Sequence, residues 1–331
     1  MASFSYDVVA VGNAIIDIIQ AVPEDFLANE NIARSSMTLI DEARADYLTN
    51  LFDEATIAAG GSAANTMTGI ASFGGRAGYI GKVAKDALGL RFIKEFRAAG
   101  VTFETPPRIG QPGTARCLIA VTPDGERSMN TYLGASTLLE PNDIDRSLIE
   151  AGAVTFLEGY LFDRDEAKAA FVKAAEIAQA AGRKVALTLS DLFCVERHRD
   201  SFRQLVKHHI DILFANEHEI LALYQTNQLE TALEAAEAEC AIVAVTRSET
   251  GSVILAGGER IPVAPMPVDR VIDATGAGDQ YAAGFLFGYA RGRPFRECGA
   301  LASLAASEVI SHFGPRPETS LAKLAHKKHL L

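Results

Sequence analysis

Short runs of β-branched and other apolar residues recur along the chain, and each has the length of a buried strand. They occupy residues 6–12, 153–159, 184–190, 211–216 and 241–246. Between them, apolar residues return every three or four positions, as on one face of a helix, for example at residues 41–52, 62–74, 164–182 and 199–209. This alternation predicts an α/β fold of three layers, in which helices cover both faces of a mainly parallel sheet.

Two segments break the alternation. Residues 18–47 contain prolines, charges and the short apolar piece MTLID, and residues 114–136 alternate apolar and polar positions around the turn signal PDG. We expect both to belong to a small β lid at the edge of the large sheet. The predicted lid comprises residues 18–47 and 101–135, and the predicted large domain comprises residues 1–17, 48–100 and 136–331.

Composition narrows the class of protein. The chain is 48% hydrophobic and 22% charged, which is typical of a globular enzyme, and its net charge of −11 argues against binding to nucleic acid. The four cysteines form no C-x-x-C pair, as expected for reduced thiols in a cytoplasmic protein. The N-terminus does not resemble a signal peptide, and the longest apolar stretch is about half of a membrane span. We therefore expect a cytoplasmic protein without membrane contacts.

The stretch DATGAGDQYAAGF, residues 273–285, raises a question about chemistry. Gly276 and Gly278 permit a tight turn in which successive N–H groups point into one volume at the start of a helix, which is a site for an anion. Asp279 follows at once. It is either a helix cap or a base, because a carboxylate beside an anion would weaken simple binding.

The longer pattern D-x-T-G-A-G-D resembles the C-terminal signature of the ribokinase-like (PfkB) carbohydrate and nucleoside kinases. The resemblance implies a ribokinase-like fold, with Asp279 as the catalytic base. It also implies that Gly276, Ala277 and Gly278 form the anion hole for the transferred phosphoryl group. The corresponding cofactors are ATP and Mg²⁺. The family often uses a monovalent cation such as K⁺ as well, for which the segments around Asp273 and Gly314 are the candidates.

Further motifs follow in the family's order and extend the resemblance over nearly the whole chain. AAGGSAAN, residues 58–65, resembles the N-terminal signature that holds substrate hydroxyls, and GKVAKDALG, residues 81–89, resembles a structural segment. NEHE implies a nucleotide role for Asn216 and a metal role, through water, for Glu219. The segment AIVAVTRSETGSVI implies that Thr246 and Gly251 bind nucleotide, although Ser248 stands where the family often has glycine.

Several features favour a nucleoside acceptor, and they resemble the adenosine-kinase branch of the family. GNAIIDI places Asn13 and Asp17 after the first strand, where a carboxylate can grip a ribose diol. GGSAANT has that branch's form, and it implies acceptor binding by Gly61, Ser62 and Asn65. LTLSDLF and EGYLFD suggest aromatic walls from Phe193 and Tyr160, although core packing explains these two rings equally well. Arg116 in the hairpin is a lid candidate, with a solvated strand face as the alternative.

The predicted function is transfer of the γ-phosphoryl group of Mg-ATP to the 5′-hydroxyl of adenosine. The alternatives are a sugar kinase acting on ribose, fructose or a ketodeoxy sugar acid, and a non-catalytic nucleoside sensor. A dinucleotide-dependent oxidoreductase is disfavoured, because VVAVGNAIID lacks the second and third glycines of the pyrophosphate fingerprint. The expected partners are small molecules, and a monomer is favoured over a dimer completed by the lid.

Overall fold

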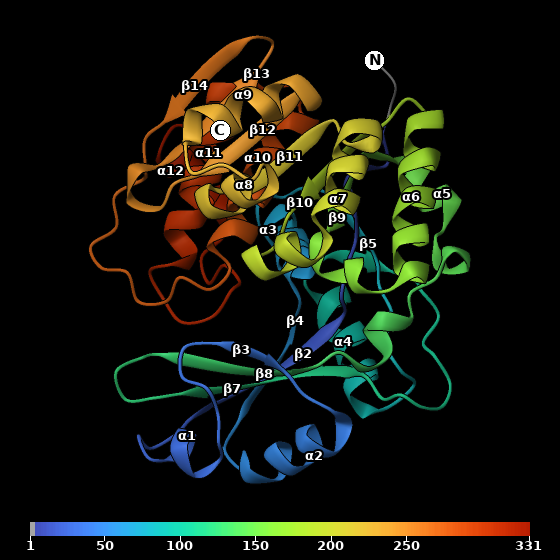
Figure 1. Cartoon of the computed structure of the whole chain (residues 1–331), viewed down its shortest axis with the longest axis vertical. Coiled ribbons are helices and arrows are strands. Elements are labelled where there is room, and N and C mark those ends of the chain that lie inside the picture. The colour runs from blue at the N-terminus through green and yellow to red at the C-terminus, as the bar shows by residue number, and fades with distance from the viewer. Residues whose placement is uncertain (1–3) are drawn as a thin grey trace.

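The computed structural model describes residues 4–331, and within that range the chain forms two sheets (Figure 1). The large sheet has nine strands, of which β13 alone runs antiparallel to its neighbours, β12 and β14, while all other neighbouring strands pair in parallel. Their spatial order is β14 (Glu259–Val263), β13 (Ser252–Ala256), β12 (Ile242–Thr246), β11 (Ile212–Asn216), β10 (Lys184–Thr188), β9 (Gly152–Glu158), β1 (Tyr6–Val11), β5 (Ala77–Ile80) and β6 (Val101–Phe103).

Helices cover both faces of this sheet, as the alternation of strands and helices predicted. Successive residues of β1 show why: Val8 and Ala10 belong to one apolar core, and Val9 and Val11 belong to the other. The first core contains residues of α3 (Ser62–Ser72), α4 (Ala87–Ala98), α10 (Ala277–Ala290), α11 (Phe295–Val309) and α12 (Leu321–Lys327). The second contains residues of α5 (Arg146–Ala151), α6 (Asp165–Ala180), α7 (Leu192–His209), α8 (Glu217–Leu223) and α9 (Leu229–Glu239). The three-layer α/β prediction is confirmed.

The small sheet lies below the large one in Figure 1, at the carboxyl ends of the parallel strands. Its strand order is β3 (Met37–Leu39), β8 (Arg127–Tyr132), β7 (Ala115–Val121), β2 (Ile15–Ala21) and β4 (Thr56–Gly60). The outer face packs on α1 (Phe26–Asn29) and α2 (Glu42–Leu51) through residues such as Ile18 and Leu118. The short 3₁₀ turns are Gly134–Leu138, Pro141–Asp143, Gly159–Asp163 and Ser248–Thr250.

Strand pairing departs from the predicted lid boundaries at three places. β4, expected in the large domain, pairs with β2 in the small sheet. Residues 15–17, also expected in the large domain, belong to β2 itself. β6, expected in the lid, pairs with β5 in the large sheet. The cause is that a strand of three to five residues has too short a pattern to show which sheet it joins. Among the helices that the structure describes, none has the length and apolarity needed to cross a membrane.

Candidate active site

A cavity of about 1060 Å³ lies between the carboxyl edge of the large sheet and the inner face of the small sheet. Neighbouring parallel strands end at this edge, so their final residues meet there: Glu158 pairs with Thr188, and Asn216 pairs with Thr246. All four line the cavity. The carboxyl edge is where open α/β sheets place ligands. The predicted residues that line it are Asn13, Asp17, Gly61, Ser62, Asn65, Tyr160, Asn216, Glu219, Thr246, Gly251, Gly276, Ala277, Gly278 and Asp279.

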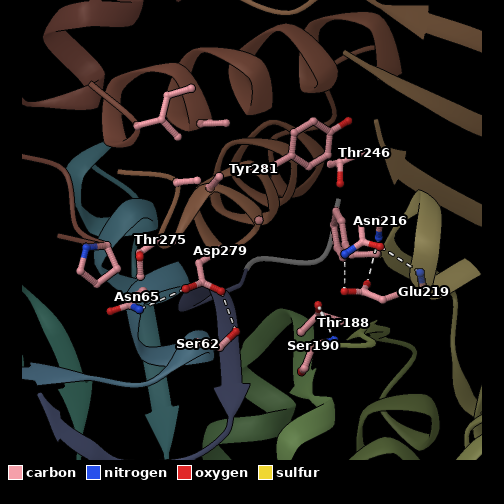
Figure 2. A pocket seen from close by; sticks show the side chains of 18 of the residues that line it. Ser62, Asn65, Thr188, Ser190, Asn216, Glu219, Thr246, Thr275, Asp279 and Tyr281 are labelled. Atoms are coloured by element: carbon pink, nitrogen blue, oxygen red, sulfur yellow. Dashed lines mark hydrogen bonds between the residues drawn. The ribbon is translucent and has the colours of Figure 1, made fainter. Parts of the chain in front are cut away.

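Asp279 lies in the first turn of α10, directly after the glycine-rich loop. Gly276 is the N-cap residue and has φ +80°, and a Cβ there would lie 2.7 Å from Pro315. Figure 2 shows Asp279 between Ser62 and Asn65. Its Oδ1 accepts a hydrogen bond from Ser62 Oγ at 2.6 Å, and its Oδ2 accepts one from Asn65 Nδ2 at 3.0 Å. The carboxylate therefore accepts side-chain donors rather than capping its own helix.

Burial makes this carboxylate a better base than an exposed aspartate. Loss of solvent raises the pKa of Asp279 from 3.8 to about 6, even though the bonds from Ser62 and Asn65 lower it. Burial also raises the pKa of Asp17 on β2 to about 6, although the positive charges of Arg316 and Arg127 lower it. Two carboxyl groups in one cavity thus titrate near neutral pH, as groups at functional sites often do.

Asn13 is held by a carboxylate that the motifs did not single out. Glu158, at the end of β9, accepts hydrogen bonds from Asn13 Nδ2 at 2.8 Å, Asn13 N at 3.3 Å and Ala63 N at 2.7 Å. Burial raises the pKa of Glu158 to about 7. Because Nδ2 is committed to Glu158, the other side of the amide, Oδ1, is buried without a hydrogen-bond partner among the described residues. This oxygen is available to accept from a ligand hydroxyl.

The turn before α3 brings the second glycine motif against Asn13. Gly61 has φ +105°, and a Cβ there would lie 2.2 Å from the Asn13 carbonyl oxygen. Tyr79 donates to the same carbonyl oxygen at 2.7 Å. Only glycine fits this approach, which places the start of α3, with Ser62 and Asn65, beside Asp279.

Polar groups of the other end of the cavity come from β11, β12 and the loop after β12. Asn216 and Glu219 form a capping box: Asn216 Oδ1 accepts from Glu219 N at 2.9 Å, and Glu219 accepts from Asn216 N at 2.9 Å. In Figure 2 this pair lies across the cavity from Asp279, near Thr246. Ser248 adopts the left-handed φ of +49°, which explains why glycine suits this position.

The residues at this end fit a nucleotide with a divalent cation held through water. Both carboxylate oxygens of Glu219 already accept from Asn216, and burial raises the pKa of Glu219 to about 7. Among residues 4–331, His, Cys, Asp and Glu side chains form no group of three that could hold a metal directly. A hydrated Mg²⁺, which keeps several waters, needs no such group. Apolar side chains that could face a nucleobase are Pro265, Met266, Val268, Val271, Ala306 and Ile310.

Two predicted residues do not reach the cavity. Phe193, in the first turn of α7, is 69% exposed and is not a lining residue. Arg116 occupies the strand position before Cys117, and because Cys117 faces the cavity, Arg116 faces the opposite side, where it pairs with Asp46 of α2. Tyr160 does line the cavity.

The motifs indicated neither Arg197, which lines the cavity, nor Arg127 and Arg316, which lie near it without lining it. Arg127 of β8 forms an ion pair with Asp273 Oδ2 at 2.5 Å, and its Nε and Nη1 are buried without partners in the described chain. Asp273 Oδ2 also accepts from Gly314 N at 2.8 Å, so the two segments expected near a monovalent cation do lie together. Arg316 donates to Asn65 from the loop after α11. Neither Arg127 nor Arg316 belongs to a periodic pattern that could have revealed its position.

Comparisons with known proteins agree with this geometry. The model of the pfkB family carbohydrate kinases matches residues 6–321. Adenosine kinase of Saccharomyces cerevisiae is 27% identical over 331 aligned residues, which cover 93% of this chain and 95% of that protein. The crystal structure of adenosine kinase from Sinorhizobium meliloti is 50% identical, with a TM-score of 0.91 over 98% of this chain and 99% of that one. A probable sugar kinase from Rhizobium etli is 48% identical, with a TM-score of 0.93 over 99% of this chain and 100% of that one. The chain therefore belongs to the pfkB family of carbohydrate kinases and is a phosphotransferase.

Proposed function

We propose that the protein transfers the γ-phosphoryl group of ATP to the 5′-hydroxyl of adenosine, giving AMP and ADP. The observation that carries the proposal is the position of Asp279, a buried carboxylate beside a glycine-rich helix start. In the same cavity lie polar groups suited to hydroxyls and an apolar lid face suited to a base. Similarity to the adenosine kinases of S. cerevisiae and S. meliloti supports the same acceptor.

The acceptor's ribose binds between β1, β2 and α3. Asn13 Oδ1 and the Asp17 carboxylate accept from two of its hydroxyls, since each of these oxygens can take an O–H donor. Gly61, Ser62 and Asn65 close the other side of this subsite. The 5′-hydroxyl then points toward Asp279, the carboxylate at the start of α10.

The purine lies against Tyr160 and the inner face of the lid. That face presents the side chains of Met37, Leu39, Ile119, Met129 and Leu133 to the cavity. A purine gains free energy from burying its apolar faces there, whereas a free sugar offers mainly hydroxyls. The lid face is the feature that favours a nucleoside over a sugar.

Asp279 takes the proton of the 5′-hydroxyl as that oxygen attacks the γ-phosphorus. Its raised pKa makes it basic enough at neutral pH while it remains largely ionised. The transferred group meets the N–H groups at the start of α10, where the Gly278 N–H belongs to the first turn and lacks an intrahelical acceptor. The Ala277 N–H is less available, because it donates to the Ala274 carbonyl at 3.2 Å.

Positive charge must offset the carboxylate beside the phosphates. Arg127, which acts electrostatically on Asp17 although it does not line the cavity, is the lid arginine that we assign to this role in place of Arg116. Asn216, Thr246 and Gly251 hold the nucleotide phosphates, and Glu219 holds Mg²⁺ through water. Mg²⁺ held there would withdraw charge from the phosphate oxygens. A K⁺ ion near Asp273 and Gly314 would add to the same field.

The test is ADP release from Mg-ATP with adenosine, inosine, guanosine, ribose and fructose at equal concentrations, with and without K⁺. We expect adenosine to give by far the highest kcat/KM. If ribose or fructose gave the highest kcat/KM, the acceptor would be a sugar rather than adenosine, and Tyr160 would be assigned to core packing. The absence of turnover with every acceptor would refute this assignment and favour a nucleoside sensor.

A further inference from the structure

The loop between α11 and α12 carries one arginine toward the proposed acceptor subsite. Arg316 Nε donates to Asn65 Oδ1 at 3.3 Å, and its guanidinium carbon lies 5.9 Å from the centre of the Phe96 ring. Arg316 does not line the cavity itself. Its direct hydrogen bond to the site is the one to the Asn65 amide.

This loop is fastened to both helices that form the site. Gln280 Nε2 donates to the Pro315 carbonyl at 3.0 Å and to the Asn65 carbonyl at 3.0 Å. Pro315 also packs against Gly276, where no Cβ would fit. The backbone on either side of the Arg316–Asn65 bond is therefore tied to the same side chain, Gln280, so the bond joins rigid parts.

The Asn65 amide has a different neighbour on each side. Its Oδ1 accepts from Arg316, and its Nδ2 donates to Asp279 Oδ2 at 3.0 Å. While Asp279 is ionised, both contacts favour this orientation. Once Asp279 holds a proton, it becomes a donor, and an unrestrained amide could rotate and accept that proton through Oδ1. Such a rotation would stabilise the protonated form of Asp279 and slow the loss of the proton that regenerates the base.

We propose that Arg316 is a positioning residue that keeps the Asn65 amide group directed at Asp279 through both protonation states of the base. The proposal rests on the function proposed above, in which Asp279 takes the hydroxyl proton. The proton moves from the acceptor hydroxyl to Asp279 and leaves to solvent, and Arg316 takes no part in that transfer.

Other charges around Arg316 must be separated from this effect. Asp17 on β2, Glu95 on α4 and Tyr79 on β5 act on the guanidinium, and burial opposes its charge. Arg316 in turn lowers the pKa of Asp17, which Arg127 also lowers and Asp279 raises. Loss of the positive charge therefore acts on acceptor binding through Asp17, and is read in KM rather than in kcat.

Three substitutions of Arg316 separate the effect of its hydrogen bond from the effect of its positive charge. Arg316→Gln places an N–H donor at the position of Nε without a charge, Arg316→Lys keeps the charge but has carbon at that position, and Arg316→Met keeps neither. Arg97→Met is a control away from the site, because Arg97 donates to the Phe103 carbonyl through Nε at 3.0 Å and through Nη2 at 2.8 Å, pairs with Glu104, and lies outside the cavity.

We expect kcat to fall roughly two- to ten-fold in Arg316→Met and Arg316→Lys, the range for one lost hydrogen bond. The apparent pKa on the acid side of the plot of kcat against pH should rise by roughly 0.3–1 unit, which corresponds to a two- to ten-fold change in the acid dissociation constant. Arg316→Gln should restore kcat to within about twofold of the wild type. Arg97→Met should lower Tm and leave kcat and the pH profile unchanged.

Two results would overturn the proposal. One is equal kcat values in Arg316→Gln and Arg316→Met, which would assign any loss to charge or packing. The other is a further loss when Arg316→Met is added to Asn65→Ala, because a residue acting through Asn65 has no effect once that amide is gone. The wild-type acceptor is established first and used for every variant, so a wrong acceptor refutes the proposed substrate without touching this comparison.

Discussion

Asp279→Asn is the substitution that separates a base from a helix cap. The amide has the size of the carboxylate, and it can keep both of the present neighbours. Its oxygen can accept from Asn65 Nδ2, and its NH₂ can donate to Ser62 Oγ after that hydroxyl rotates. The local hydrogen bonds therefore survive, and the change removes only the negative charge and the ability to take a proton.

The same change should reduce activity and increase stability. A positioned general base accelerates proton transfer by roughly 10²–10⁴-fold, so we expect kcat to fall by that factor or more. The pKa of Asp279 is raised from 3.8 to about 6, a shift of about 2 units. At about 1.4 kcal/mol per unit, the buried charge costs at most about 3 kcal/mol at pH 8. Removal of that cost should raise Tm by up to roughly 4 °C in a chain of this length.

The stability gain depends on pH with a defined sign. A carboxyl group whose pKa is raised by folding binds its proton more tightly in the folded state. Its stabilisation is fully present below pH 3.8 and is lost as the pH rises through about 6. The wild type and Asp279→Asn should therefore differ most above pH 6, and they should converge near pH 4.

The assays are ADP release, isothermal titration of adenosine and thermal unfolding at pH 4, 6 and 8. Loss of turnover with retained adenosine binding and a higher Tm at pH 8 is the expected combination. Turnover within tenfold of the wild type would refute the base assignment. A fall in Tm at pH 8 together with lost binding would show that Asp279 is a structural cap.

Three further substitutions test other parts of the site. Tyr160→Leu should raise the adenosine KM roughly two- to ten-fold and leave the ATP KM unchanged, since one aromatic stack is worth about 0.5–1.5 kcal/mol; equal changes in both constants would assign Tyr160 to the core. Glu219→Gln keeps only one of the two acceptors used by Asn216; we expect a higher KM for Mg-ATP and a higher Mg²⁺ requirement, and an effect on adenosine alone would contradict the metal role. Gly61→Ala puts a Cβ 2.2 Å from the Asn13 carbonyl oxygen at φ +105°; unfolding experiments should show a loss of about 1–3 kcal/mol and weakened adenosine binding, and an unchanged KM would show that Asn13 does not hold the acceptor.

The sequence predicted the layers of the fold, and most of the predicted site residues line the cavity, for one physical reason. The motifs stand at the ends of parallel strands and at the starts of the helices that follow, and a parallel sheet brings those ends to one edge. Thus Asn216 and Thr246, 30 positions apart in sequence, become paired neighbours. The lid boundaries were less predictable, because β4 and β6 are short and each could join either sheet.

The direction of side chains in the lid could not be derived from the strand pattern. In β7 both faces are apolar: Cys117 and Ile119 face the cavity, while Leu118 and Ala120 belong to the core. A period of two then fails to distinguish inside from outside, so the pattern left both interpretations of Arg116 open, and the structure agrees with a strand face turned away from the cavity. Glu158 did leave a signal that can be recognised afterwards: a single carboxylate ends the apolar strand AVTFLE, where only a specific partner makes its burial tolerable.

Buried polar groups without partners in and around the candidate site favour a role in binding a ligand. Asn13 Oδ1, Arg127 Nε and Nη1, and Arg316 Nη2 are all buried without hydrogen-bond partners among the described residues. Each such group costs about 1–3 kcal/mol when it stays dry. The carboxyl groups of Asp17 and Asp279 add a further cost, since burial raises the pKa of both to about 6. Asn13, Asp17 and Asp279 line the cavity, where a ligand with hydroxyl groups would be complementary to their oxygens, whereas Arg127 and Arg316 lie outside the lining.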